Sequence, residues 1–283
     1  MKKKLVSVIL PVFRAVPDYL EQSLQSILSQ TYDEIELIVV LDKYDHNIDG
    51  LSFAVLEKFK DDHRLQLVVN ERRTGLASSL NAGIRFAKGE YIARMDSDDI
   101  SLPVRIEEEF EVVRKRHFDL VGCWAKVIDE LNRSMGYLSP PCEWQAIRKY
   151  LLFHNPFLHS TILFRRKVIE VVGLYEPEYE LSEDYEFYMR AFSAGFKGMN
   201  IPKYLHLLRE HYSSMVRGSR WKQNRITNLK CKLAGVFDYH FNTPRDVLYL
   251  GITPLSFLLN PGKVLIAKRL VGLYYKKVSP SST

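Results

Sequence analysis

Cysteine is scarce in this chain of 283 residues, and its three copies, Cys123, Cys142 and Cys231, are scattered without any CxxC spacing. An odd number of isolated cysteines argues against both a disulfide framework and a zinc site. We therefore expect the three thiols to be buried and the protein to reside in a reducing compartment.

Glycine-rich nucleotide-binding motifs are missing. No Gly-x-Gly-x-x-Gly follows the first apolar run, and no GxxxxGK occurs anywhere in the chain. These motifs supply the backbone amides that hold phosphates in dinucleotide-binding dehydrogenases and in P-loop NTPases, so both classes of enzyme are disfavoured. No helix-turn-helix, zinc-finger or RNP pattern is present either, and nucleic acid is not an expected partner.

Long hydrophobic runs are also missing. The uncharged stretch at 247–262 contains 16 residues, two of them proline, whereas a helix that spans a membrane needs about 20 apolar residues. The short run Leu5 to Leu10 follows three lysines, but it stops at Pro11 and lacks a small-x-small cleavage site. We interpret it as a strand and not as a signal peptide.

Positive charge is concentrated near the end of the chain. The net charge is +6, and residues 211–283 contain twelve Lys/Arg residues and only two acidic ones. Because apolar residues are mixed with these basic ones, an anionic membrane surface fits better than nucleic acid. We expect the segment 216–283 to be a basic helical extension that associates with the membrane surface; a helix pair packed on the domain is the alternative.

Strands and helices alternate in the first part of the chain. The runs expected to be strands lie at 5–12, 35–41, 65–69 and 91–95, and the helical segments begin at Pro17, Leu51, Leu76 and Val104. This alternation predicts βαβ units, and hence an α/β fold with a mainly parallel sheet flanked by helices. Beyond Phe118 we expect strands at 120–128 and 157–164 and helices at 144–153, 183–194 and 219–239.

Three carboxylates, Asp96, Asp98 and Asp99, follow the fourth expected strand. Ligands bind at this end of the strands in open α/β sheets, and clustered acids need a cation, a positive helix end or solvent. An all-oxygen group suits Mg²⁺ or Mn²⁺, which could hold a diphosphate. The alternative is that Asp99 or Ser101 caps the following helix while the other acids are solvated.

A set of motifs resembles the family 2 glycosyltransferases of the GT-A (Rossmann-like) fold over about residues 5–212. The segments occur in the order VSVILPVFR, SILSQTYDEIELIVVLD, NERRTGLASSLNAGI, AKGEYIARMDSDDISLPVRI, HSTILFRRKVI and SEDYEFYMR. The family transfers a sugar from a nucleotide diphosphate donor to an acceptor hydroxyl with inversion at the anomeric carbon. The form IARMDSDD is similar to non-processive bacterial enzymes that build O-antigen, capsule and exopolysaccharide.

The resemblance implies a nucleotide site at the ends of the first two strands. Pro11, Phe13 and Arg14 stand where the family holds the base, although the family often has Asn at the position of Arg14. Asp42 matches the acid that accepts a hydrogen bond from uracil N3–H. The family usually has two acids followed by Gly-Ser there, and this chain has Lys43-Tyr44 after Asp42; from position alone, Asp42 could instead form a turn.

The resemblance also implies a metal site and a base. Asp96-Ser97-Asp98 matches the DXD motif, with Asp98 as the direct ligand of Mn²⁺ or Mg²⁺ and Asp96 against the ribose or a metal-bound water. Glu183-Asp184 matches the ED pair, with Asp184 as the catalytic base and Glu183 positioning acceptor or base. Without the family match, two acids at a helix start are an ordinary N-terminal preference.

Four further side chains are candidates for the site. The guanidinium groups of Arg73 and Arg94 match phosphate geometry, although either could be a surface residue or a partner of the acids. His159 stands where relatives often have a histidine near donor or acceptor; a buried structural role is the alternative. Arg209, two residues before His211, matches a segment that closes over the diphosphate in relatives.

We therefore expect a catalytic domain at 1–215, with a nucleotide-binding half at about 1–100 and an acceptor-binding half at about 101–215. The expected reaction moves a hexose or N-acetylhexosamine from a UDP-sugar to a saccharide on a lipid diphosphate, such as undecaprenyl diphosphate, at the inner face of the cell membrane. The alternatives are a nucleotidyltransferase similar to sugar-nucleotide pyrophosphorylases and a catalytically silent subunit that binds nucleotide-sugars or membranes. No glycine-rich loop follows the first strand, which disfavours the pyrophosphorylase.

Overall fold

A computed structural model describes residues 3–42, 46–151 and 154–210, with only the backbone for 46–49, and the single positions 227, 229–231 and 234. The expected alternation of strands and helices in the first part of the chain is confirmed. Four strands are parallel and lie in the order β3-β2-β1-β4. They are β1 (Val6–Val12), β2 (Ile35–Asp42), β3 (Leu65–Asn70) and β4 (Tyr91–Arg94).

The sheet continues beyond β4 with strands of mixed direction. β8 pairs antiparallel with β4, β6 pairs antiparallel with β8, and β9 pairs parallel with β6 and antiparallel with β5, while β7 pairs with β6 off this path. These strands are β5 (Ile100–Ser101), β6 (Leu120–Ile128), β7 (Ser134–Leu138), β8 (Leu163–Arg165) and β9 (Gly198–Arg209). The two halves of the described chain therefore share one nine-stranded sheet.

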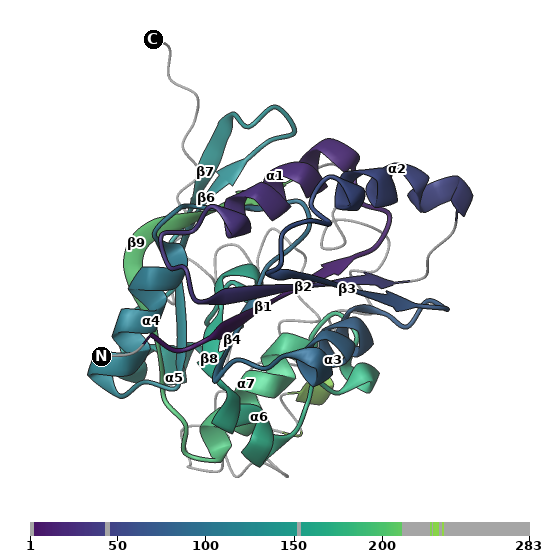
Figure 1. Ribbon diagram of the computed structural model, residues 1–283. Helices are drawn as coiled ribbons and strands as arrows, with labels where there is room; N and C mark the ends of the chain where they lie inside the picture. The colour runs from purple at the N-terminus through teal and green to yellow at the C-terminus, as the bar shows by residue number, and fades with distance from the viewer. Residues whose placement is uncertain are drawn as a thin grey trace, which may run out of the picture.

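Helices cover both faces of the sheet. Figure 1 shows α1 and α2 above the sheet and α3, α6 and α7 below it. The helices are α1 (Pro17–Leu28), α2 (His46–Glu57), α3 (Leu76–Phe86), α4 (Arg105–Arg116), α5 (Trp144–Leu151), α6 (Arg166–Val172) and α7 (Glu183–Ser193). One face of α1 is buried at Leu20, Leu24 and Ile27.

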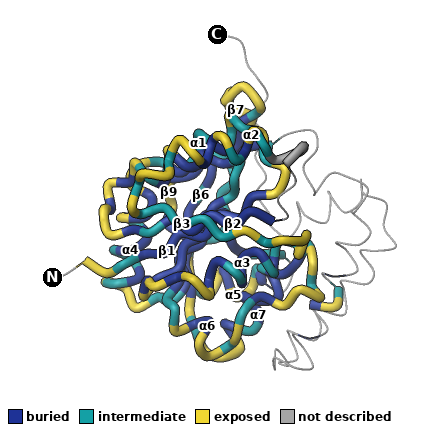
Figure 2. The backbone as a smooth tube through the Cα atoms, turned by 45° about the vertical axis from the view of Figure 1, so that its right-hand side comes forward, coloured by how far each residue is buried: buried dark blue, intermediate teal, exposed yellow. Residues whose placement is uncertain are grey.

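The core lies between the central strands and these helices. Every residue of β1 is buried, and Figure 2 shows buried residues in the centre and exposed ones on the outer loops. Continuous apolar strands are what a sheet with two covered faces requires, because neither face of the strand meets water.

One expected strand is shorter than the sequence suggested. The segment 157–164 was expected to be extended, but His159–Thr161 forms a 3₁₀ turn, and the strand is confined to Leu163–Arg165. The hydroxyl of Thr161 donates to the carbonyl of Leu158 at 2.9 Å, which favours the turn over a strand. This turn places His159 beside the sheet instead of within it.

The predicted C-terminal extension lies mostly outside the described residues. Within it, positions 227, 229–231 and 234 are helical, and Cys231 is buried with its Sγ 3.8 Å from the Ser182 carbonyl. The uncharged stretch 247–262 and the expected membrane contact also fall outside them. Within the described ranges, no helix is long and apolar enough to cross a membrane.

We expect Gly89→Ala to destabilise the protein by about 1–3 kcal/mol, because the added methyl group overpacks a filled site. A Cβ at Gly89 would lie 2.6 Å from the Leu5 carbonyl oxygen and 2.8 Å from the Ser7 nitrogen, both backbone atoms. Urea denaturation measures the free energy of unfolding. In the control Gly50→Ala, within α2, a Cβ meets nothing within 4 Å. That helix substitution should stabilise by about 0.5–1 kcal/mol; equal effects of the two changes would contradict the prediction.

Candidate active site

The acid loop, residues 96–99, follows the end of β4 and is separated from it by Met95 alone. Asp96 forms a bidentate ion pair with Arg94, whose side chain is almost fully buried. Burial, together with the charges of Asp99 and Asp98, raises the pKa of Asp96 to about 7, and the charge of Arg94 opposes this shift. Arg94 is thus a buried partner of the acids, which is one of the alternatives to a phosphate contact stated for it above.

Asp99 faces the protein interior. Its Oδ1 accepts from the main-chain N–H of Arg209 at 2.8 Å, and its Oδ2 pairs with Nε2 of His206 at 2.8 Å. Burial alone would raise the pKa of Asp99, but these two partners hold it below its usual value. The alternative that Asp99 or Ser101 caps the next helix is wrong, because α4 has Val104 at its N-cap and no side-chain cap.

His206 is a neutral partner for this carboxylate. It is fully buried, burial lowers its pKa, and its Nδ1 has no hydrogen-bond partner. A buried N–H without an acceptor is costly, so the proton belongs on Nε2, where it is donated to Asp99. His206 was not anticipated from the sequence, since 107 residues separate it from Asp99.

A second group of acids lies at the start of α7. Oδ2 of Asp184 accepts a hydrogen bond from the Asn155 amide, and Oδ1 accepts from the Tyr185 main-chain N–H at 2.7 Å. Burial raises the pKa of Asp184. Burial, reinforced by the charge of Asp184, raises the pKa of Glu183 to about 7. The pKa values of these two adjacent carboxyl groups are therefore higher than those of free Asp and Glu side chains.

His159 lies beside this pair. Its Nδ1 is 3.8 Å from Oδ2 of Asp184, and its Nε2 is 3.3 Å from the Tyr175 hydroxyl. Burial lowers the pKa of His159 well below its usual value, so the imidazole is neutral at pH 7. The main chain of Tyr175 is in turn fixed by two hydrogen bonds with the Asn81 side chain, at 2.7 and 3.0 Å.

Arg94 links the acid loop to the α7 pair. Its main-chain N–H donates to the Ile162 carbonyl at 2.9 Å, which joins the end of β4 to the turn that carries His159. Burial is the main cause of the pKa shifts of His159, Glu183 and Asp184, and the Arg94 charge lowers all three pKa values. Arg94, which is paired with Asp96, is therefore close enough to the α7 acids to lower their pKa values, although Asp96 and Asp184 are about ninety positions apart in the sequence.

Asp42, the last residue of β2, fixes the loop between β3 and α3. Its Oδ1 accepts from the main-chain N–H and the hydroxyl of Thr74 at 2.8 and 2.7 Å, and from the Asn70 amide at 3.3 Å. Its Oδ2 accepts from the Gly75 N–H at 3.0 Å, and the residue is only 4% exposed. Asp42 is thus a long-range anchor and not a local turn former.

The other residues expected around the nucleotide lie close to this loop. Pro11 is buried within β1, and the Phe13 ring is partly exposed just beyond it. The guanidinium carbons of Arg73 and Arg14 lie 4.6 and 5.3 Å from the centre of that ring. Cation–π contacts of this kind hold both arginines near the end of β1.

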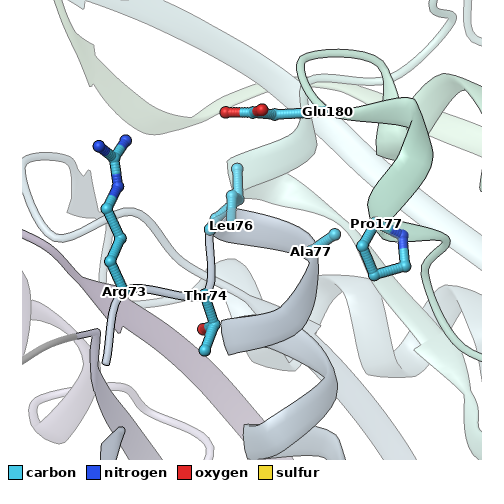
Figure 3. A pocket seen from close by; sticks show the side chains of 7 residues that line it. Arg73, Thr74, Leu76, Ala77, Pro177 and Glu180 are labelled. Carbon is cyan, nitrogen blue, oxygen red and sulfur yellow. The ribbon is translucent and has the colours of Figure 1, made fainter. Parts of the chain in front are cut away.

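A cavity of about 400 Å³ opens between the start of α3 and the segment that leads to Glu183. Figure 3 shows Arg73 and Glu180 extending from opposite sides of this cavity. Its lining residues are Arg73, Thr74, Gly75, Leu76, Ala77, Pro177 and Glu180. The cavity therefore lies between the loop held by Asp42 and the segment that immediately precedes the α7 acids.

Two groups of side chains could hold a cation. His159, Glu183 and Asp184 place one donor atom each within 4.8 Å of the others. Asp96 and Asp98 offer oxygen donors alone, the type that Mg²⁺ and Mn²⁺ prefer. Mutual repulsion helps to raise the pKa of Asp96, and a bound cation would relieve it. The acid loop therefore fits the expected metal.

A family model described as "Glycosyl transferase family 2" matches residues 7–173. The chain belongs to this family. It is 33% identical to the "O-antigen biosynthesis glycosyltransferase WbnJ" of Escherichia coli over 190 residues. This alignment covers 66% of this chain and 71% of WbnJ. The protein is therefore a glycosyltransferase with a relative in O-antigen biosynthesis, which argues against the nucleotidyltransferase alternative.

Solved structures show the fold. S. aureus TarS 1–349 in complex with UDP-GlcNAc matches with a TM-score of 0.67 and 17% identity, over 87% of this chain and 70% of TarS. The mannosyltransferase PcManGT of Pyrobaculum calidifontis, in complex with GDP-Man and Mn²⁺, matches with a TM-score of 0.61 and 18% identity, over 97% of this chain and 82% of PcManGT. The α/β GT-A fold expected from the sequence is confirmed.

The raised pKa of Glu183 predicts a pH-dependent effect of Glu183→Gln. The native state holds this proton more tightly than the unfolded state, so stability is lost as pH rises from the ordinary value of 4.5 to about 7. Glutamine cannot ionise, so the variant should gain about 2 kcal/mol relative to the parent between pH 5 and pH 8.

Urea denaturation at the two pH values measures this gain. Glu178→Gln is the matched control, because Glu178 is an exposed acid of the same segment. A difference between Glu183→Gln and the parent that stays constant from pH 5 to pH 8 would contradict the assignment.

Proposed function

We propose that this glycosyltransferase is a metal-dependent, inverting enzyme that moves a hexose or N-acetylhexosamine from a UDP-sugar to an acceptor sugar hydroxyl. The observation that carries the proposal is that Asp184, a buried carboxyl with a raised pKa, and Asp96 of the acid loop both lie within the electrostatic reach of Arg94. An inverting displacement needs one base on the face of the sugar opposite the leaving group, and a donor-binding site beside it.

The donor nucleotide is assigned to the region around Asp42 and the 400 Å³ cavity. Oδ2 of Asp42 accepts one hydrogen bond from Gly75, and a carboxylate oxygen has a second lone pair for uracil N3–H. Phe13 presents a partly exposed ring to the base, beside Pro11. Arg73 and Arg14, held over that ring, supply positive charge for the diphosphate.

The acid loop is the proposed site of Mn²⁺ or Mg²⁺, with Asp98 as the direct ligand and Asp96 beside it. When bound there, the metal would neutralise charge that develops on the departing nucleoside diphosphate. Arg94 holds Asp96 in a fixed orientation through both carboxylate oxygens. Asp98 is half-buried, which leaves it closer to solvent than the fully buried Asp99.

Asp184 is the proposed catalytic base. As the acceptor oxygen attacks the anomeric carbon, the C–O bond to the diphosphate breaks and Asp184 takes the hydroxyl proton. The Asn155 amide orients the carboxylate by donating to Oδ2, and Nδ1 of the neutral His159 lies 3.8 Å from the same oxygen. Burial strengthens the base because it raises the pKa of the carboxyl. Glu183 is assigned a positioning role next to the acceptor.

The proposed acceptor is a saccharide on a lipid diphosphate such as undecaprenyl diphosphate, used at the inner face of the cell membrane. The twelve basic residues of 211–283 support an anionic surface as partner of the proposed extension, 216–283. Residues 1–215 are assigned to the catalytic domain, with the nucleotide in its first half and the acceptor in its second. The relationship to WbnJ supports a role in surface polysaccharide synthesis.

Asp184→Asn tests the mechanism. The amide keeps the shape of the side chain but cannot accept the proton, so kcat should fall at least about 100-fold. UDP and Mn²⁺ binding, measured by calorimetry, should stay within twofold of the parent. Transfer at the parental rate by this variant would remove Asp184 from the base role.

Neutralising the basic cluster Lys263, Lys268, Arg269, Lys276 and Lys277 with glutamine tests the membrane assignment. Each charge is worth about 1 kcal/mol at an anionic surface, so co-sedimentation with phosphatidylglycerol vesicles should weaken at least tenfold. Transfer to a short soluble acceptor should not change.

The matched control makes the same charge change on exposed lysines of the catalytic part, Lys3, Lys58, Lys60, Lys115 and Lys203. It should leave vesicle binding within twofold. Equal loss in both variants would show that net charge, and not this segment, governs binding.

A further inference from the structure

The guanidinium of Arg209, the last residue of β9, is buried behind the acid loop. Its Nε donates to the Asp98 carbonyl at 2.8 Å, its Nη1 to the Asp129 carbonyl at 3.0 Å, and its Nη2 to Oε1 of Gln22 at 3.1 Å. The ring of Tyr19 lies 4.1 Å from the guanidinium carbon. The sequence suggested that this segment closes over the diphosphate, but Arg209 is only 4% exposed and fully engaged within the protein; His211 lies outside the described residues.

The main chain of the acid loop is fixed from two sides. From α1, the Ser23 hydroxyl donates to the Asp96 carbonyl at 2.8 Å. From β9, Arg209 holds the Asp98 carbonyl and, through its own N–H, the Asp99 carboxylate. β9 also pairs with the next two residues of the chain, since Ile100 and Ser101 form β5.

His206, which also belongs to β9, provides a further attachment of the acid loop to this strand. Its Nε2–H donates to the second oxygen of Asp99, and both side chains are buried. A buried carboxylate with a donor on each oxygen has a fixed orientation, because loss of either bond would remove a hydrogen bond from a charged group that is away from water. The backbone of Asp98 cannot move without breaking hydrogen bonds to β9.

We propose that Arg209 and His206 are positioning residues for metal binding, which they support by holding the Asp98 main chain without touching metal or substrate. This inference rests on the proposed role of Asp98 as a metal ligand. Groups behind a ligand commonly affect metal affinity about 10- to 100-fold, because they set the orientation of that ligand. Only a planar guanidinium, with five N–H donors, reaches Asp98, Asp129 and Gln22 together.

Arg209→Lys in the full-length protein is the first test. Lysine keeps the charge but loses the fork, so the dissociation constant for Mn²⁺, measured by electron paramagnetic resonance in the presence of UDP, should rise about tenfold. The value of kcat at saturating Mn²⁺ should stay within about threefold of the parent, because Arg209 contacts no reacting group.

Arg133→Ala is the matched control. Like Arg209, Arg133 contacts Asp129: its Nε lies 2.7 Å from Oδ2 of Asp129, but its side chain is 72% exposed. Its hydrogen bonds go to Asp129 and not to Asp98. Mn²⁺ affinity should therefore stay within twofold of the parent in this variant.

A pair of variants at His206 gives a second, independent measurement. Glutamine retains a side-chain N–H for Asp99, whereas leucine removes it and leaves the buried carboxylate short of a donor. We expect His206→Gln to keep Mn²⁺ affinity within about threefold and His206→Leu to lose about tenfold. If Arg209→Lys does not fold, this pair decides the matter.

The outcomes separate the inference from the function on which it rests. Wild-type Mn²⁺ affinity in Arg209→Lys and His206→Leu, with only a lower melting temperature, would overturn the positioning role. Asp98→Ala should abolish Mn²⁺ binding; if it binds Mn²⁺ normally, the metal site itself is misassigned. Loss of binding in Asp98→Ala but not in the Arg209 and His206 variants would leave the metal site standing and refute the inference.

Discussion

The buried charge of Arg94 is the constraint on which the site depends. Carboxyl groups gather on two sides of it, Asp96 and Asp99 in the acid loop and the pair at the start of α7. Without a cation between them, such acids would be protonated or would draw in water, because burial and mutual repulsion both disfavour their ionised forms. A buried guanidinium is costly by itself; the bidentate bond to Asp96 offsets part of this cost, whereas the Arg94 Nε has no hydrogen-bond partner within the described residues.

The sheet explains how this charge reaches both groups. β1 lies between parallel β2 and parallel β4, so the strand order reverses at β1, and the switch point lies between the carboxyl ends of β1 and β4. Ligands bind outside such a point because the neighbouring connections diverge there and leave space. The turn before β8 brings His159 alongside, and α7 then places Asp184 next to it. A reversal within one sheet thus assembles residues from distant parts of the chain.

The sequence was most informative where the chemistry is local. Continuous apolar runs predicted β1 to β4, and the acids after β4 stood out because polar residues end an apolar strand abruptly. β9 was not predicted, since its exposed centre, Pro202 and Lys203, interrupts the apolar pattern. The partners His206 and Asn155 could not be predicted either, nor could the contact of Arg209 with the Asp98 carbonyl, because each of these contacts spans 29 or more positions. Such contacts follow from strand order, and no local pattern encodes it.

Asp42 carries a consequence for engineering the donor preference. Its carboxylate holds Thr74 and Gly75, and so also the neighbouring Arg73 and the wall of the cavity. In the proposed donor site, the recognition of the base and the shape of the space beside it would therefore both depend on this one side chain. A single exchange at this position would not simply replace one nucleobase by another. A switch from uridine to guanosine nucleotides would require the residues from Asn70 to Gly75 to be redesigned as a unit.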